Sequence, residues 1–331
     1  MEFSPVLLVV LGLVVAAEFV NGWTDAPNAI ATVVSTRVLS PGRAVLLAAI
    51  LNLVGAMCGT AVAATIGKGI VQPEAITIAT VGAAMVGIIF WSTFAWFYGL
   101  PTSESHALIA GLTGAALASA GPEALLWTGW KKVLVGLAFS TFLGFGAGLV
   151  LMTAIYRIWA KSSPSVVRRL FGKLQVMSAG FMAFSHGSND GQKFIGTFTL
   201  VLLLGGVIPE FRVPLWVIFL CACVMSMGTA VGGWRIMKTM GLSLTKLEPV
   251  HGFAAETSAA GTIILASAFG IPLSTTHTIN TAIMGVGATR RFSAVRWGVS
   301  RNIVTAWILT FPVCGLIAFG VAKLIVMLTA T

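Results

Sequence analysis

Charged residues are scarce in this chain of 331 residues, of which they make up 9%. Soluble domains carry about 25%. Apolar residues account for 57% of the chain, and its mean hydropathy is +0.96. This composition excludes an ordinary soluble domain. It predicts an all-α polytopic membrane protein, because a helix satisfies its own backbone groups in lipid.

Several chemical signatures are also missing. The four cysteines lie in apolar runs without metal-ligand or redox spacing, so we interpret them as buried apolar residues. The sequence contains no nucleophile elbow, P-loop or zincin motif, and therefore nothing favours an enzyme. The net charge of +10 comes largely from short loops between apolar runs, which is typical of membrane topology. We expect no cofactor and no nucleic-acid partner.

One motif occurs twice and organises the chain. Residues 99–106 and 270–277 share the pattern G-x-P-x-S-x-[ST]-H, 171 positions apart. Gly and Pro end the preceding helix, and Ser103 or Ser274 stands where an N-cap belongs. Each copy therefore predicts a broken helix whose second part begins with free N–H groups and hydroxyls, which suits an anion.

Other features repeat at nearly the same offset. Asp25 and Asp190 are 165 positions apart, and the sequence Gly-Thr-Ala-Val recurs at 59–62 and 228–231, an offset of 169. We therefore predict an internal duplication, with repeats at 1–156 and 174–331 joined by a basic cytoplasmic loop at 157–173.

The loop charges predict how the halves insert. Basic loops lie at 37–43, 157–173, 235–246 and 290–301, while loops 67–75, 121–130 and 208–212 alternate with them and are nearly neutral or mixed. The positive-inside rule puts the basic set in the cytoplasm of a multi-pass plasma-membrane protein, with the N-terminus outside. The halves then enter from opposite sides as inverted repeats, and we expect the two motifs to form re-entrant helical hairpins with tips at mid-membrane.

The remaining runs give simpler expectations. Polar clusters at 21–28 and 185–192 predict interruptions in membrane helices, whereas 44–66 and 213–234 predict uninterrupted spans.

Asp25 and Asp190 are the sharpest candidates for chemistry. A carboxylate inside a membrane span is costly and is by default a functional hypothesis. Amides lie close to both, namely Asn28, Asn189 and Gln192. Carboxylate, amide and freed carbonyl oxygens suit Na⁺ or a proton relay. A helix-capping role beside a structural break is the alternative.

Short hydroxyl side chains mark the two predicted helix starts: Ser103, Ser105, Ser274, Thr275 and Thr276. Each alone is an ordinary capping residue. Two such starts facing one another would surround an oxyanion without many arginines, which favours release as well as binding.

Four further polar residues have two interpretations each. His106 and His277 lie one helical turn after the capping serines, so they contact phosphate or fix the hairpins. Lys193 pairs with Asp190 or contacts an anion. Glu256, within an apolar run, is a coupling candidate or a polar core contact. His186 is a weaker candidate, and the histidine spacing does not favour a metal site.

The motifs resemble those of the inorganic phosphate transporter (PiT) family. The similar segments are 25–36, 101–106, 186–192 and 272–277, and the likeness covers essentially the whole chain. It implies Na⁺- or H⁺-coupled phosphate uptake by an inverted-repeat homodimer. By resemblance, Asp25 and Asp190 fall on essential aspartate positions, and Glu256 falls on a glutamate important in animal members.

The sequence therefore predicts a Na⁺–phosphate symporter. We expect Asn28 and Gln192 to complete a phosphate site formed by the five hydroxyls, and Asp25, Asp190 and Asn189 to hold Na⁺. Two Na⁺ with H₂PO₄⁻ would move one net positive charge inward. The alternatives are H⁺ coupling, sulfate as substrate, a passive anion channel, and an intramembrane enzyme acting on a phosphate-bearing lipid.

Overall fold

The computed structural model describes residues 4–329 and is helical, with no strand in that part of the chain. The first seven α-helices are α1 (Pro5–Ser35), α2 (Pro41–Ala56), α3 (Ala61–Gly69), α4 (Ile78–Phe97), α5 (Glu104–Ser119), α6 (Trp127–Ala138) and α7 (Gly144–Ile158). The next seven are α8 (Pro164–His186), α9 (Gln192–Leu204), α10 (Leu215–Val231), α11 (Trp234–Lys238), α12 (Pro249–Ala268), α13 (Thr275–Ala288) and α14 (Trp297–Thr329). The all-helical membrane architecture expected from composition is confirmed.

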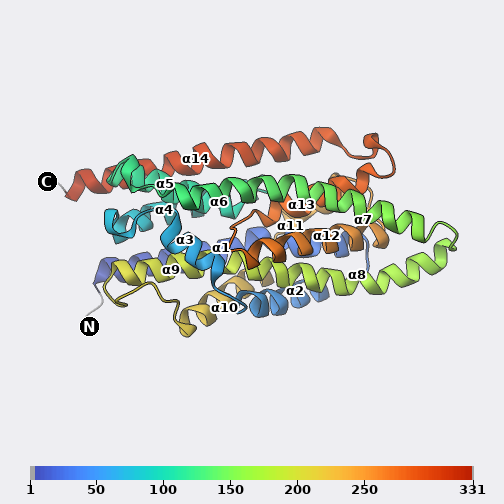
Figure 1. The fold of residues 1–331 in the computed structure, drawn as a ribbon, viewed down its shortest axis with the longest axis horizontal. Helices are drawn as coiled ribbons and strands as arrows, with labels where there is room; N and C mark the ends of the chain where they lie inside the picture. The colour runs from blue at the N-terminus through green and yellow to red at the C-terminus, as the bar shows by residue number, and fades with distance from the viewer. Residues whose placement is uncertain (1–3, 330–331) are drawn as a thin grey trace.

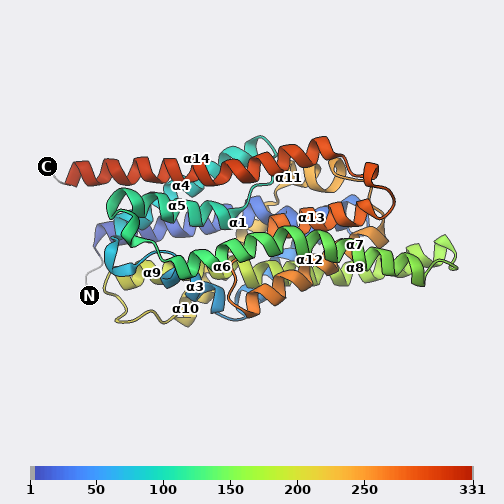
Figure 2. The same cartoon turned by 45° about the horizontal axis from the view of Figure 1, so that its top comes forward.

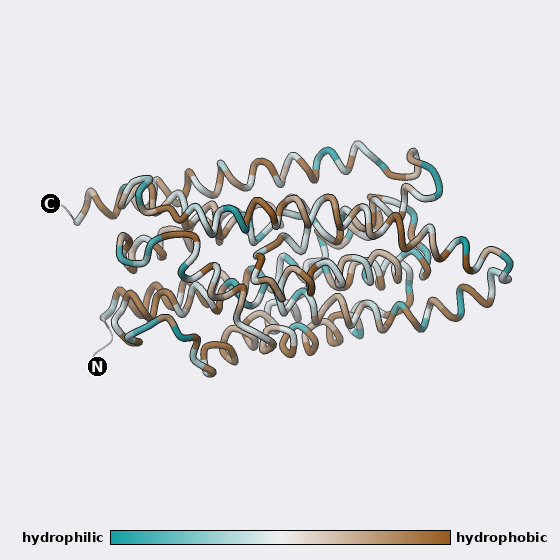
Figure 3. Tube along the Cα trace, in the orientation of Figure 1, coloured by the Kyte–Doolittle hydropathy of each residue, from teal (hydrophilic) through white to brown (hydrophobic). Residues whose placement is uncertain are grey.

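The helices run along one long axis, and the two ends of the bundle differ (Figures 1 and 2). The start of α1 and the end of α14 lie at one end, and the turn between α7 and α8 lies at the other, which we call the connector end. Hydrophilic loops cluster at the ends, and brown, apolar residues prevail along the helices (Figure 3). In the described residues, four helical segments are long and apolar enough to cross a membrane, or six if each of two bent pairs is one span.

The twin motifs form two helix–break–helix units on opposite sides of the bundle's middle. The unit α4–α5 lies toward the termini and α12–α13 toward the connector end, so their breaks face each other (Figures 1 and 2). Gly99 and Gly270 open the breaks at φ 67° and 64°, a left-handed conformation that favours glycine. The expected hairpins therefore exist and meet tip to tip.

Each break is held by a bent span from the other half of the chain. Thr65 of α3 donates to the Gly270 carbonyl oxygen at 2.8 Å, and Thr239, just after α11, donates to that of Gly99 at 2.8 Å. We call these two hydrogen bonds the latches. They satisfy carbonyl groups that the broken helices leave free, which matters because lipid offers no partner.

Two separate apolar cores flank the middle of the bundle. One contains Val14, Ile88 and Phe194, whereas the other contains Met152 and Ile283, as representatives of larger clusters. Lipid tails are as apolar as these side chains, so close packing rather than water exclusion stabilises the cores. The buried polar side chains lie between them.

Two expected interruptions are wrong. α1 runs unbroken through the polar cluster 21–28, with Pro27 inside it, and 187–191 forms a π-helical turn between α8 and α9. A continuous or locally widened helix keeps most backbone hydrogen bonds internal, the favoured arrangement in a membrane. The polar side chains are instead accommodated by neighbouring helices.

Three expected continuous or unstructured segments are also wrong. Segment 44–66 is broken between α2 and α3 with a 69° bend, and 213–234 is broken between α10 and α11 with a 60° bend. The predicted loop 157–173 is mostly helix, because Pro164 starts α8 at the first helical position. Apolar composition does not reveal these features, since a bent helix and a straight one share it.

The halves share several elements in the same order. Each half has one bent pair and one hairpin, and a short 3₁₀ turn follows each hairpin, at Pro122–Ala124 and Phe292–Ala294; the first half has a further 3₁₀ turn at Pro73–Ala75. The inverted relation between the halves and the boundaries 1–156 and 174–331 stay predictions.

Candidate functional site

Buried polar side chains from four parts of the chain meet between the two apolar cores. The central cluster, as we call it, combines α1, the π-helical turn with the start of α9, and the two breaks. Its members are Asp25, Asn28, Ser103, Ser105, His106, His186, Asp190, Lys193, Ser274, Thr275, Thr276 and His277, all less than a tenth exposed.

The capping serines expose the helix starts as the motif predicts. Ser103 accepts a hydrogen bond from the His106 backbone N–H at 3.3 Å, and Ser274 accepts one from that of His277 at 3.1 Å. Ser105 donates across to the Leu273 carbonyl oxygen at 2.8 Å, so the two breaks are in direct contact.

The second break presents two hydroxyls to the acidic residues. Thr275 donates to Asp190 at 2.7 Å, and Thr276 lies 3.3 Å from both carboxylate oxygens of Asp25. Asn28 donates to the hydroxyl oxygens of Thr275 and Thr276 at 3.3 and 3.0 Å. The structure thus brings α1 and the second break together, although 247 positions separate Asn28 from Thr275.

Asp190 also has a basic partner. Lys193 donates to the Asp190 carboxylate, to the Ser105 hydroxyl oxygen and, at 3.0 Å, to the Leu273 carbonyl oxygen. The pairing of Lys193 with Asp190, one of its two expected roles, is therefore present.

His186 is central, although the sequence ranked it low. Its Nδ1 lies 3.1 Å from the Asn52 side-chain oxygen, and its Nε2 lies 3.1 Å from Asp190 Oδ2 and 4.0 Å from Asp25 Oδ2, without a well-aligned hydrogen bond to either carboxylate. Its position four residues before Asp190 places both side chains on one helix face, the signal that could have singled it out.

The two motif histidines pack against each other. The His106 and His277 rings lie 4.6 Å apart edge to face, and His277 also stacks on Trp307 at 3.7 Å. Both ring nitrogens of His277 are buried without a hydrogen-bond partner in the described structure. These contacts fit hairpin support, and a phosphate contact stays a prediction.

Glu104 is a second residue that sequence reasoning missed. It is 2% exposed at the start of α5 and accepts hydrogen bonds from Thr24 at 2.9 Å and Ser92 at 2.7 Å. A sequence signal for it exists: the two motifs differ at this position, where the first has the acidic Glu104 and the second has Thr275.

Glu256 belongs to a separate polar group toward the connector end. It accepts hydrogen bonds from Thr32, Gln175 and Ser178, and none of its oxygen atoms is exposed enough to reach water. Fully hydrogen-bonded burial fits a polar core contact as well as the coupling role, which stays a prediction.

Two expected ligands have other partners in this conformation. Gln192 accepts from the Val62 backbone N–H at 3.0 Å and donates to the Cys58 carbonyl oxygen at 3.1 Å, so it fills the bend between α2 and α3. Asn189 donates to Ser267 at 2.8 Å, while its oxygen has no partner among the described residues. Gln192 is thus occupied, whereas the Asn189 oxygen is available to a cation.

The cluster offers two kinds of chemistry. Asp25, His186 and Asp190 place ligand atoms within 4.8 Å of one another, close enough to hold a cation. Hydroxyls and helix starts offer hydrogen-bond donors to an anion. Buried charges in a membrane need such compensation, so a cation and an anion bound at this cluster would stabilise each other.

A family model described as "Phosphate transporter family" matches residues 21–318. This chain belongs to that family. Its members are transporters, so the family assignment agrees with the expectation that the protein is not an enzyme, and the enzyme alternative loses its support. A multi-pass membrane protein of phosphate transport is the conclusion that the family and the apolar helices establish together.

Related proteins agree over almost their full length. A probable low-affinity inorganic phosphate transporter of Rhizobium meliloti (strain 1021) is 44% identical over 316 residues, 95% of either chain. Another, of Bacillus subtilis (strain 168), is 38% identical over 326 residues, 97% of either chain. A solved structure named "The sodium-dependent phosphate transporter" matches this chain with a TM-score of 0.90 at 25% identity. The match covers 98% of this chain and 100% of the solved one.

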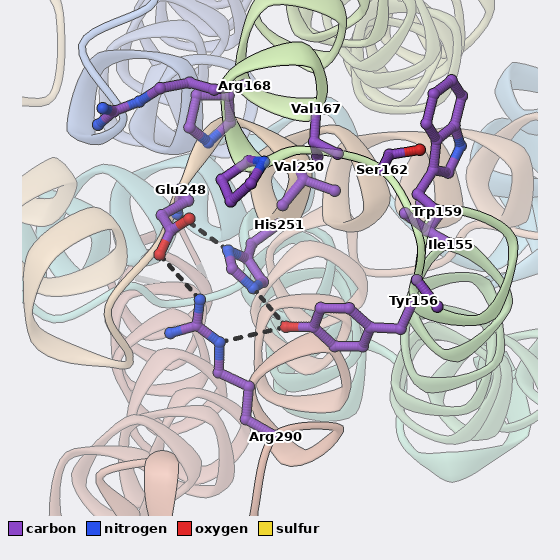
Figure 4. A pocket seen from close by; sticks show the side chains of 13 residues that line it. Ile155, Tyr156, Trp159, Ser162, Val167, Arg168, Glu248, Val250, His251 and Arg290 are labelled. Carbon is purple, nitrogen blue, oxygen red and sulfur yellow. Dashed lines mark hydrogen bonds and ion pairs between the residues drawn. The ribbon is translucent and has the colours of Figure 1, made fainter.

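A third polar group lies at the connector end and lines a pocket (Figure 4). Arg290 pairs with Glu248 at 2.9 Å and donates to the Tyr156 hydroxyl at 3.2 Å, and Tyr156 is hydrogen-bonded to His251 at 2.8 Å. These residues line a cavity of about 290 Å³ between α7, α8 and α12. The hydrogen bond from Arg290 lowers the pKa of Glu248 below its ordinary value. The group ties the end of α7 to the start of α12.

Proposed function

We propose that the protein is a Na⁺–phosphate symporter that works by alternating access. The observation that carries the proposal is the meeting of two carboxylates, Asp25 and Asp190, with the hydroxyls of the second break in one buried cluster. A site that binds only an anion would not need buried acids, because they repel it.

The anion half of the proposal uses the two facing helix starts. Ser103, Ser105, Ser274, Thr275 and Thr276 would supply hydroxyls and nearby N–H groups to inorganic phosphate, with Asn28 and, after its release from the bend, Gln192 completing the shell. Helix starts carry partial positive charge, so they attract an oxyanion without fixing it permanently.

The cation half uses Asp25, Asp190 and the free oxygen of Asn189. These hard oxygen ligands suit Na⁺, and a bound cation would cancel the repulsion between the carboxylates and phosphate. The name of the solved relative, a sodium-dependent transporter, supports Na⁺ as the cation. A net positive charge moving inward gains about 2.3 kcal/mol per 100 mV, so the membrane potential can drive uptake.

The latches suggest how access alternates. Because Thr65 of α3 holds the second break and Thr239, just after α11, holds the first, opening one latch would free one hairpin while the other stays closed. In other secondary transporters with inverted repeats, one repeat or bundle rocks or gates against the other around a midplane site.

The test is uptake of radioactive phosphate into proteoliposomes with an inward Na⁺ gradient, with K⁺ as the replacement cation. We expect uptake to require Na⁺, and Asp25→Asn and Asp190→Asn to lower it at least about 100-fold, since each leaves buried groups without a charged partner. Normal rates in both variants would end the cation-site assignment.

The remaining rivals are separated in the same vesicles. Uptake driven by a pH gradient without Na⁺ would favour H⁺ coupling, and competition by sulfate at similar concentration would favour a general anion carrier. Downhill flux that ignores every cation would favour a channel.

Orientation and assembly belong to the proposal as well. Basic loops at the connector end support a cytoplasmic connector and an outer N-terminus in the plasma membrane. Labelling of a cysteine introduced at Ser162, in a variant whose exposed Cys58 is replaced by serine, in intact and in lysed cells, tests this: we expect label at Ser162 only after lysis. A homodimer is expected, and the mass of the detergent-extracted protein by light scattering checks it.

A further inference from the structure

Lys193 is 1% exposed and ranks among the largest fully buried side chains of the described protein. It stands at the start of α9, and its ammonium group reaches three elements: the π-helical turn, the first break and the second break. Its partners are the Asp190 carboxylate, the Ser105 hydroxyl and, at 3.0 Å, the Leu273 carbonyl oxygen.

These three oxygens are the kind that bind a free alkali cation. A carboxylate, a hydroxyl and a backbone carbonyl together form a hard oxygen ligand set. An ammonium group has three N–H donors, and here each oxygen accepts one of them. None remains for phosphate, so Lys193 acts in this conformation as a cation and not as an anion ligand.

The first half of the chain differs at the corresponding position. With the 165-residue offset that relates Asp25 to Asp190, Lys193 corresponds to Asn28. Both follow their aspartate by three residues, one helical turn. In the first half, Asp25 is thus followed by a neutral amide, that of Asn28. In the second half, Asp190 is followed by the ammonium group of Lys193.

The two carboxylates are accordingly compensated to different extents. Asp190 accepts from Lys193 and from Thr275 at 2.7 Å, and His186 Nε2 lies 3.1 Å from it. Asp25 has two long contacts of 3.3 Å to the Thr276 hydroxyl, and the same His186 nitrogen lies farther from it, at 4.0 Å. A buried carboxylate without a cation is costly. Asp25 therefore needs a cation from solution, and Asp190 already has one.

We propose that Lys193 is a tethered cation that replaces a transported one at Asp190, so each phosphate travels with one cation fewer than the two acidic residues would otherwise carry. This inference rests on the proposed symport and narrows it, assigning the transported cation to Asp25.

The decisive variant is Lys193→Asn, which gives the second half the residue of the first. It leaves Asp190 open to a cation from solution. We expect the charge moved per phosphate, measured as current and radioactive uptake on the same proteoliposomes, to rise by about one elementary charge. Lys193→Arg, which keeps the charge, and Lys323→Gln, at an exposed site on α14, are the controls and should leave the ratio unchanged. An unchanged ratio in Lys193→Asn overturns the proposal.

A second variant covers the case in which Lys193→Asn does not fold or transport. Asp190→Asn with Lys193→Asn removes both charges together and leaves no carboxylate for a cation. We expect its charge per phosphate to equal that of the wild type. A ratio lower by about one charge would show that Asp190 carries a transported cation in the wild type, and would overturn the proposal. If neither variant transports, Na⁺-dependent thermal stabilisation of the purified proteins is the test. Greater stabilisation of Lys193→Asn than of wild type by Na⁺ supports the tethered cation. Equal or smaller stabilisation, or loss of the folded protein, overturns the proposal.

Failure of the proposed function would look different. Wild-type uptake that ignores Na⁺ contradicts Na⁺ symport, but the charge per phosphate counts whichever cation travels. The change between wild type and Lys193→Asn therefore tests the tethered cation even if the coupling ion is a proton.

Discussion

The two breaks share a local structure but differ in what they present to the centre. Both open with a left-handed glycine, both have a capping serine, and both are latched by a threonine from the other half. They diverge after the cap: Glu104 in the first break turns to α1 and α4, whereas Thr275 in the second turns to Asp190. The features that the breaks share therefore fix their backbone conformation, and the residues that differ give each break different polar contacts.

The helices that lead into the breaks show the same division. α4 begins with a capping box between Thr77 and Thr80, and α12 begins with one between Glu248 and His251. Both boxes satisfy free N–H groups, but only the second adds a charge, at the connector end. The second unit, α12–α13, therefore contacts Asp25 and Asp190 at its break and has a charged cap at the start of α12.

The largest expected difference between the breaks concerns Thr276 and its counterpart Ser105. Thr276→Val keeps the shape but leaves Asp25 and Asn28 without that hydroxyl. We expect phosphate uptake to fall by at least about tenfold, because a hydrogen bond to a charged group contributes about 1.5–3 kcal/mol. Ser105→Ala should lower uptake less, since the Leu273 carbonyl still accepts from Lys193. Equal losses in the uptake assay would mean that the breaks contribute alike.

Exchanging residues at the acidic position sharpens the comparison. Glu104→Thr gives the first break the residue of the second, but threonine is too short to reach Thr24 and Ser92. We expect a lower melting temperature from a loss of about 1–3 kcal/mol, the cost of leaving buried polar groups unpaired. The control is Glu104→Gln, whose amide retains hydrogen bonds and should melt closer to wild type. The opposite order of melting would show that the charge, not the hydrogen bonding, is what Glu104 supplies.

The latches test whether the two halves are equivalent. Thr65→Val and Thr239→Val each remove one hydrogen bond of about 1 kcal/mol to a break carbonyl. We expect faster hydrogen exchange confined to residues 270–277 in the first variant and to 99–106 in the second. Exchange that rises in both breaks in either variant would contradict separate latches.

The smallest effect concerns the charged cap. Arg290 lowers the pKa of Glu248 below its ordinary value of 4.5, so the ionised carboxylate stabilises the fold above that pH, and the contribution is lost as pH falls through the lowered pKa. Since both side chains are partly exposed, we expect about 0.2–1 kcal/mol. Thermal melting at about pH 7 and pH 4 should show that Glu248→Gln removes part of the pH dependence. Thr77→Ala, at the neutral cap of α4, should leave it unchanged.

Local signals predicted the breaks well. Gly, Pro and Ser have strong backbone preferences, so 99–106 and 270–277 indicated their own conformation before any neighbour was known. The aspartates stood out for a similarly local reason, the cost of charge in an apolar run.

Other features could not be inferred locally. The bends after α2 and α10 depend on partners such as Gln192, which contacts the first bend from 130 positions away. His186 and Glu104 gain their significance from side chains on other helices, and a single sequence does not show which helices are neighbours. The expected breaks at 21–28 and 185–192 failed because surrounding helices accept the polar side chains while the backbone stays helical.

The sequence by itself determined that this is a helical membrane protein with two broken, serine-capped helices and two buried aspartates. Those features follow from hydropathy and from backbone preferences, which act within a few residues. Only the tertiary structure decided that the breaks meet, that Lys193 pairs with Asp190, and that each half holds the hairpin of the other. Such pairings depend on which helices pack together, and packing is a property of the whole bundle.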